Sequence, residues 1–208
     1  MLQQMFNMVC TLLFSKVILN DIPHALLPGS RQEWVDPAWK SLIEFAQRKG
    51  EHVPSDYLMW GISAEDRPVV DKYKTVLAGY YLIATERAPD YVIDEVYAIL
   101  KDGLKRRLPP LPELEQELLR LKRREAVGSA NIHDRMIMNY LERVIPILKL
   151  FVDGTRSDKV IAIDSLMSYS HEHAAFIDDV LDIKEEQKEL FMFEGAPCSV
   201  MLLDALAR

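Results

Sequence analysis

The chain has 208 residues and a mass of 23.9 kDa, which suits one folded domain. Hydrophobic residues make up 49% of it and charged residues 27%, enough for a sizeable core under an ordinary polar surface. The formal net charge of −7 argues against a protein that binds nucleic acid through the phosphate backbone.

The N-terminal segment is predicted to form an amphipathic core helix. Apolar residues between Leu2 and Val17 follow the spacing of one helix face. No basic residue precedes them, as one would in a signal peptide, and Lys16 and Asp21 come too soon for a membrane span. We therefore expect no membrane segment here.

Three helices are predicted between residues 36 and 103, each with start and stop signals. Asp36-Pro37 has the sequence of a helix start, and Gly50 can end that helix in the left-handed conformation. A second helix should begin at Asp66-Arg67-Pro68 and stop before Pro89, because a residue that precedes proline avoids helical geometry. A third is expected from Asp90 to Gly103.

Residues 108–112 form the clearest break in the chain, and two long helices are predicted after it. The first should present a leucine stripe from Leu114 to Leu121 and end at Gly128. The second should begin at Asn131, a good N-cap residue, and run to Asp153 with a kink at Pro146. Its inward-facing residues are predicted to be Met136, Tyr140, Val144, Ile147, Leu148 and Phe151.

Two more helices are predicted in the last third of the chain. The first should begin at Ser157 or Asp158, and a bend at residues 168–170 should separate it from a second helix over 171–189. The tail at 190–203 fits a β-hairpin or a helix end with a short terminal helix, of which we favour the helix. The sequence thus predicts an all-α chain, with residues 1–208 in a single bundle of about seven to nine helices.

The densest acidic group is Asp178-Asp179-Val180-Leu181-Asp182. On a helix, Asp178 and Asp182 would lie one turn apart on one face. The five residues resemble the DDxxD motif of isoprenyl diphosphate and terpene synthases, which implies carboxylates that hold Mg²⁺ against a diphosphate. No second acidic motif of that kind is found in the sequence. The alternative is a solvated acidic face.

His133-Asp134 resembles the metal-binding doublet of HD-type phosphohydrolases, which are all-helical. The further ligands that this resemblance implies are an earlier histidine, His52, and a later aspartate, one of Asp164, Asp178 and Asp182. His171 lies near the acidic group and could join such a site. The alternative is that Asp134 is simply an acid in the first turn of a helix.

Arg106-Arg107-Leu108-Pro109-Pro110-Leu111-Pro112 resembles the RxLPPLP class of SH3-domain ligands. The resemblance implies that the prolines, Pro109, Pro110 and Pro112, dock as a polyproline II turn while an arginine orients the peptide. The alternative is a rigid linker between two helices. Charge is also divided here, since residues 101–126 carry 8 basic and 5 acidic side chains and residues 176–194 carry 2 basic and 7 acidic ones.

These features favour an intracellular, cytoplasmic interaction, adaptor or regulatory module with no catalytic activity and no cofactor. Glycine-rich phosphate loops and nucleophile elbows are missing from the sequence, and its two cysteines are too few for a disulfide framework. We expect a protein partner or self-association, and no nucleic acid or membrane. The alternative function is a metal-dependent helical enzyme for a phosphate or diphosphate substrate, using Mg²⁺ or a similar divalent ion.

Overall fold

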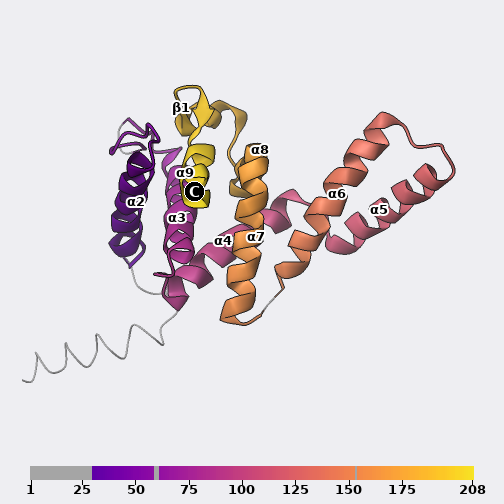
Figure 1. Ribbon diagram of the computed structural model, residues 1–208, viewed down its shortest axis with the longest axis horizontal. Coiled ribbons are helices and arrows are strands. Elements are labelled where there is room, and N and C mark those ends of the chain that lie inside the picture. The colour runs from indigo at the N-terminus through magenta and orange to yellow at the C-terminus, as the bar shows by residue number, and fades with distance from the viewer. Residues whose placement is uncertain (1–29, 59–60, 153) are drawn as a thin grey trace, which may run out of the picture.

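A computed structural model of the protein describes residues 30–58, 61–152 and 154–208. The predicted N-terminal helix and Cys10 lie outside these residues. The described chain is helical apart from one short β-hairpin, which confirms the predicted all-α class. Figure 1 shows a body of packed helices from which one pair of helices projects to the side.

The body contains six helices of the described chain: α2 (Ser30–Arg48), α3 (Arg67–Ala84), α4 (Asp90–Arg107), α7 (Arg156–Glu172), α8 (Ala174–Leu181) and α9 (Cys198–Ala207). Helix α3 lies between α2 and α7, and α4 contacts α3, α7 and α8 (Figure 1). Their inward faces form one hydrophobic core. Among its fully buried side chains are Leu42, Tyr73, Leu77, Leu100, Ile163 and Leu166.

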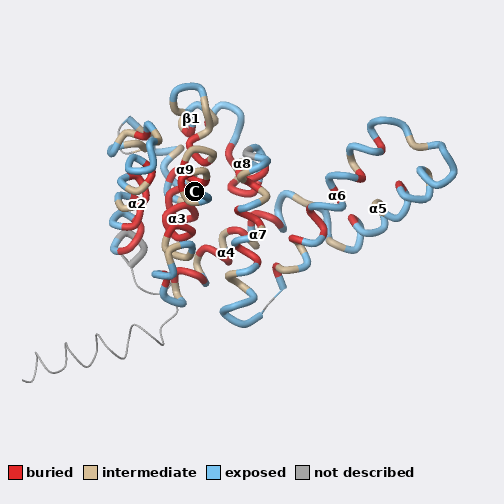
Figure 2. Tube along the Cα trace, in the orientation of Figure 1, coloured by how far each residue is buried: buried red, intermediate tan, exposed pale blue. Residues whose placement is uncertain are grey.

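The projecting pair consists of α5 (Leu111–Ala126) and α6 (Ile132–Leu150), which we call the α5–α6 hairpin. Its two helices bury a small hydrophobic cluster of their own, made of Leu114, Leu121, Met138, Leu141 and Ile145. Figure 2 shows that the hairpin is mostly exposed, with short buried stretches along both helices and at the end next to the body. Leu108 and Leu148 contact both this cluster and the main core, and so join the two.

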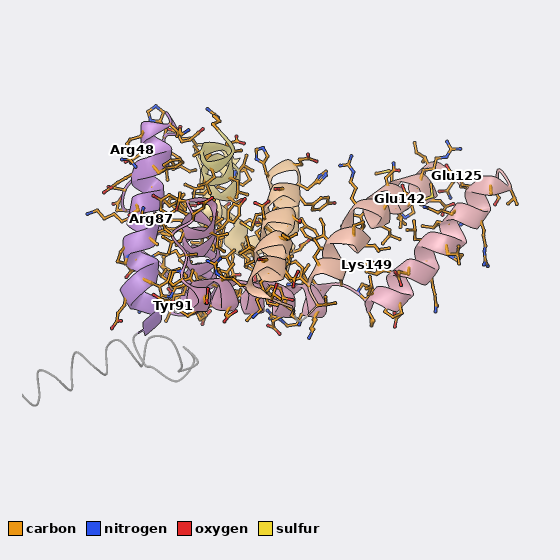
Figure 3. All side chains as sticks on the ribbon, turned by 60° about the horizontal axis from the view of Figure 1, so that its bottom comes forward. Arg48, Arg87, Tyr91, Glu125, Glu142 and Lys149 are labelled. Atoms are coloured by element: carbon orange, nitrogen blue, oxygen red, sulfur yellow. The ribbon has the colours of Figure 1, made fainter. Side chains whose placement is uncertain are left out.

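Ion pairs between the two helices support the hairpin. The Lys122 ammonium lies 2.7 Å from the Glu142 carboxylate, and that of Lys149 lies 2.7 Å from Glu115. Figure 3 labels Glu142 and Lys149 along α6. Because all four side chains are about half exposed, each pair contributes about 1 kcal/mol or less, and the buried cluster accounts for most of the packing.

Side-chain caps fix the starts of α6 and α7. The Asn131 side chain accepts a hydrogen bond from the backbone N–H of Asp134, whose carboxylate accepts one from the N–H of Asn131 in return. Thr155 and Asp158 form the same reciprocal arrangement before α7. Each cap satisfies backbone donors that have no partner within the helix. The predicted cap at Asn131 is confirmed, and α7 begins within two residues of its predicted start.

The predicted start of the first described helix is wrong. Helix α2 begins at Ser30 and contains Pro37, where a start at Asp36-Pro37 was expected. Proline within a helix removes one backbone hydrogen bond. Trp34 and Val35, in the turn before Pro37, are both buried in the main core, and burial of these side chains offsets that loss.

Gly103 does not end a helix as predicted, because α4 continues to Arg107. A Cβ at this position would overlap the backbone carbonyl of Val180, so glycine here permits the close approach of α4 and α8. Gly50 and Gly128, by contrast, have φ angles of +94° and +71° and follow α2 and α5 as predicted.

The C-terminal region differs from the prediction in two places. The expected bend at 168–170 lies inside α7, and the chain breaks instead at His173, between α7 and α8. The expected helix over 171–189 also ends early, because Asp182 adopts a left-handed conformation and a 3₁₀ helix, η2 (Glu185–Phe191), follows.

The tail combines both structures that the sequence allowed. Strand β1 (Met192–Phe193) pairs antiparallel with β2 (Ala196–Pro197). Glu194 and Gly195 connect them with positive φ angles, as a two-residue hairpin turn requires. Helix α9 then returns the chain to the body, where it packs on α2, α3 and α7.

Candidate docking surface on the projecting helix pair

An apolar stripe runs along α6 and continues beyond the body of the protein. In its second half, Val144, Ile147 and Phe151 are buried in the main core. In its first half, Met136 is 65% exposed and Tyr140 36%. The prediction that Met136 and Tyr140 face inward is therefore wrong, because this half of α6 extends past the body.

Ile132, Met136 and Tyr140, which we call the α6 stripe, lie four residues apart and share one face of the helix. Ile132 is 80% exposed. Val127, in the turn before α6, is also exposed and extends the apolar surface at the tip of the hairpin. Single exposed apolar residues are common on proteins, but an ordered row of them indicates an interaction surface.

A pocket of about 220 Å³ lies at the base of the α6 stripe, where α6 faces the end of α4 and helix α8. We call it the notch pocket. Its lining residues are Arg107, Leu108, Tyr140, Phe176, Asp179 and Val180. Because pockets that enclose a drug-sized ligand have volumes of about 300–1,000 Å³, this one suits a single side chain.

The charges around the notch pocket are unevenly matched. The guanidinium of Arg107 is hydrogen-bonded to the carboxylate of Asp182, and Arg106 lies 3.6 Å from the other oxygen of the same carboxylate. Within the described part of the chain, the Asp179 carboxylate accepts no hydrogen bond and joins no ion pair. Burial, together with nearby Tyr169 and Asp179, raises the pKa of Tyr140 to about 12.

A larger hollow, of about 460 Å³, lies beside the end of α2. It is lined by Gln47, residues 50–54 and Phe193 and opens widely to solvent. The amide of Gln47 already donates a hydrogen bond to the carbonyl of Val53 there, at 2.5 Å. The residues that line the hollow form no apolar row, so we do not assign a site to it.

The candidate metal ligands are dispersed over the structure. His133 and Asp134 lie in the first turn of α6, at the tip of the hairpin (Figure 1). Asp134 belongs to the cap described above and lies 2.9 Å from the guanidinium of Arg124. Its position and its contacts are those of a helix start. His52 lies in the loop after α2, within the body.

The acidic group on α8 does not form the predicted row of carboxylates. Asp182 lies beyond the end of α8 with a φ angle of 64°, and its side chain contacts Arg107, away from the face of Asp178. The Nδ1 atom of His171 lies 3.0 Å from the Asp204 carboxylate. Burial raises the pKa of Asp178. Over the described ranges, no three His, Cys, Asp or Glu side chains gather as metal ligands would.

The proline segment is divided between two helices. Arg106 and Arg107 belong to the last turn of α4, and Pro112 to the first turn of α5. Extended backbone is confined to residues 108–110, with a ψ angle of 145° at Leu108 and of 141° at Pro110. An SH3-type contact over all seven residues would therefore require the first turn of α5 to open. The contact between Arg107 and Asp182 also joins the basic and acidic segments within one chain.

Sequence reasoning placed Met136 and Tyr140 on one face of α6 but missed their exposure and did not include Ile132 in that face. Of the residues that line the notch pocket, it singled out Arg107 and Asp179 for other roles and missed the apolar ones. Leu108, Phe176 and Val180 have ordinary apolar surroundings in the sequence, and nothing there indicates that they line one pocket. Comparison with protein-family models, curated proteins and solved structures finds no match for the chain. In the ranges that the structure describes, none of the helices has the length and apolar character needed to cross a bilayer.

Proposed function

We propose that this protein is an interaction module that binds an amphipathic helix of a partner protein along the α6 stripe. The observation that carries the proposal is the continuity of the stripe. The same face of α6 is buried in the main core at Val144 and Ile147 and uncovered at Met136 and Ile132. A partner helix would cover the part of this face that the body leaves open.

The proposed contact is of the helix-in-groove type, in which apolar residues of a partner, spaced by one turn, pack on an apolar row. The α6 stripe presents such a row at one-turn intervals. The cluster around Leu141 and the ion pairs of Lys122 and Lys149 hold α6 in place before a partner arrives. A preorganised surface loses less conformational entropy on binding.

Selection of displayed peptides tests the proposal. A phage-displayed library of helical peptides is selected on the whole protein, and the enriched peptides are then bound to Met136→Asp and to Leu119→Asp. Leu119 is a matched control, because it is apolar and 51% exposed but lies on α5, away from the stripe. We expect enriched peptides to carry at least two apolar residues four positions apart, to lose binding to Met136→Asp and to keep binding to Leu119→Asp.

Two results would overturn the proposal. One is a selection whose peptides bind Met136→Asp as well as the wild type, or in which no peptide is enriched. The other is sedimentation that shows concentration-dependent dimers of the wild type and monomers of Met136→Asp, since the stripe would then be covered by a second copy of the chain.

A further inference from the structure

We propose that the notch pocket accepts a basic side chain, of arginine or lysine, from the helix that lies on the α6 stripe. This inference rests on the proposed function, because it assigns the chemistry of one residue in the same partner. Tyr140 links the two features, since it ends the α6 stripe and also lines the pocket.

The walls of the pocket suit a long side chain with an apolar stem and a cationic end. Leu108 and Val180 are apolar and can pack on methylene groups, and Tyr140 and Phe176 contribute aromatic rings. Arginine and lysine bury their methylene stems on apolar surface, and their charged groups are attracted to aromatic faces. The pocket volume of about 220 Å³ limits the occupant to one such side chain.

The sign of the charge follows from Asp179. Asp179 lines the pocket, is exposed, and has no hydrogen bond or ion pair among the described residues. Arg107, which also lines the pocket, is held by Asp182, and Lys188 lies 2.5 Å from Glu185. The pKa of Lys188 is raised mainly by its hydrogen bond to Glu185 and further by the charges of Asp178 and Asp179. A cation that enters the pocket therefore lies beside a carboxylate that forms no ion pair with the described residues. The net charge of −7 also favours the approach of a basic partner over an acidic one.

The position of the basic residue in the partner helix can also be inferred. Ile132, Met136 and Tyr140 follow each other at intervals of one helical turn. A partner helix that runs along α6 would place apolar residues against Ile132 and Met136, and its next turn would lie over the pocket. The expected pattern is two apolar residues four apart and a basic residue four further along, in either chain direction.

Small probes test the pocket without any partner. n-Butylguanidinium, its neutral analogue n-butylurea and the anion pentanoate are titrated into the full-length protein and followed by NMR. We expect n-butylguanidinium to bind with a millimolar dissociation constant and to shift the signals of Tyr140, Phe176 and Val180. n-Butylurea and pentanoate should bind more weakly by at least about fivefold, because neither offers a cation to Asp179.

Two variants separate the pocket from its surroundings. Asp179→Asn should weaken n-butylguanidinium binding by at least about fivefold, whereas Asp178→Asn, the adjacent acid, should leave it within about twofold. Equal binding to Asp179→Asn and the wild type, tighter binding of pentanoate, or absence of shifts at Tyr140 and Phe176 would each overturn the inference.

The same probe distinguishes failure of this inference from failure of the proposed function. Met136→Asp leaves the pocket lining unchanged, so it should bind n-butylguanidinium as the wild type does while losing the selected helical peptides. Peptides that need Met136 but show no preference for a basic residue would overturn the pocket assignment alone. Probe binding without any selected peptide would overturn the docking proposal and the assignment of the cation to a partner helix, but would keep the preference of the notch pocket for a cation.

Discussion

The backbone of Gly103 in α4 lies directly against the carbonyl of Val180 in α8, with no room for a side chain between them. The contact sets the distance between the helix that leads into the α5–α6 hairpin and the helix that forms the opposite wall of the notch pocket. Because the obstructing atoms belong to the backbone, a rotamer change cannot relieve the overlap that a side chain would cause.

Gly103→Ala should therefore destabilise the protein by about 3 kcal/mol, at the upper end of the range for overpacking. In an exposed helix the same change would stabilise by about 0.5–1 kcal/mol, so the sign of the effect is diagnostic. Urea unfolding measures it. Lys105→Ala, at an exposed position two residues later, is the control and should change stability by about 0.5 kcal/mol or less. A neutral Gly103→Ala would show that the two helices are not in backbone contact.

Asp182 should be sensitive to backbone conformation more than to charge. Its φ angle is 64°, a region that asparagine and glycine tolerate and alanine does not. Asp182→Asn loses only partly exposed ion pairs with Arg107 and Arg106, each worth about 1 kcal/mol or less. Asp182→Ala loses the same pairs and also forces alanine into the left-handed region, at about 1–2 kcal/mol more. Thermal or urea unfolding of both variants tests the difference, and equal losses would contradict the described turn.

Asp178 should make stability depend on pH in a direction opposite to most carboxylates. Burial raises the pKa of Asp178 in the folded protein. The contribution of Asp178 to the free energy of unfolding is therefore fully present below its ordinary pKa of about 3.9, and it is lost as pH rises through the higher pKa of the folded state. Asp178→Asn should therefore raise the urea midpoint at pH 7, and the gain should disappear below about pH 4. If the urea midpoint of Asp178→Asn at pH 7 were lower than that of the wild type, the folded state would stabilise the charged form of Asp178.

Asp158 provides the matched contrast. Hydrogen bonds from Thr155 lower the pKa of Asp158 in the folded protein. The contribution of Asp158 to the free energy of unfolding is therefore present above its ordinary pKa, and it is lost as pH falls through the lower pKa of the folded state. Asp158→Asn should lower the urea midpoint at pH 7, the opposite of Asp178→Asn, because it also weakens the cap of α7.

The two faces of α6 should respond differently to truncation. Leu141 is buried against α5, and its replacement by Ala should destabilise the protein by about 2–5 kcal/mol. Met136 is mostly exposed, so Met136→Ala should cost less than about 1 kcal/mol. In Leu141→Ala, amide hydrogen exchange should show the largest loss of protection within residues 111–150. A large loss of stability in Met136→Ala would mean that another part of the same chain packs on the α6 stripe.

Local signals in the sequence predicted much of the fold. The Asn131 cap and the left-handed glycines at 50 and 128 depend on a few neighbouring residues, and each lies where it was expected. The proline-rich break is shorter than expected, because α5 begins at Leu111, within residues 108–112. The errors came from contacts between distant segments. Burial of Trp34 extends α2 through Pro37, and the approach of Val180 gives Gly103 a role that no local pattern indicates.

The candidate site was predictable only in part, for the same reason. The spacing of Met136, Tyr140 and Val144 identifies one apolar face, but a sequence cannot show how far a body of packed helices extends along it. For Asp182 the sequence spacing was misleading. Its distance from Asp178 along the chain predicts a shared helix face, but α8 ends in a left-handed turn at Asp182, and the carboxylate contacts Arg107.

The affinity of a selected helical peptide for three forms of the protein tests the docking surface most directly. Isothermal titration should give a dissociation constant at least about tenfold weaker for Met136→Asp than for the wild type, because a buried charge would face an apolar anchor. Leu119→Asp should match the wild type within about twofold, since it lies outside the α6 stripe. Equal affinity of Met136→Asp and the wild type, or a loss in Leu119→Asp as large as that in Met136→Asp, would contradict the assignment of the α6 stripe as the binding surface.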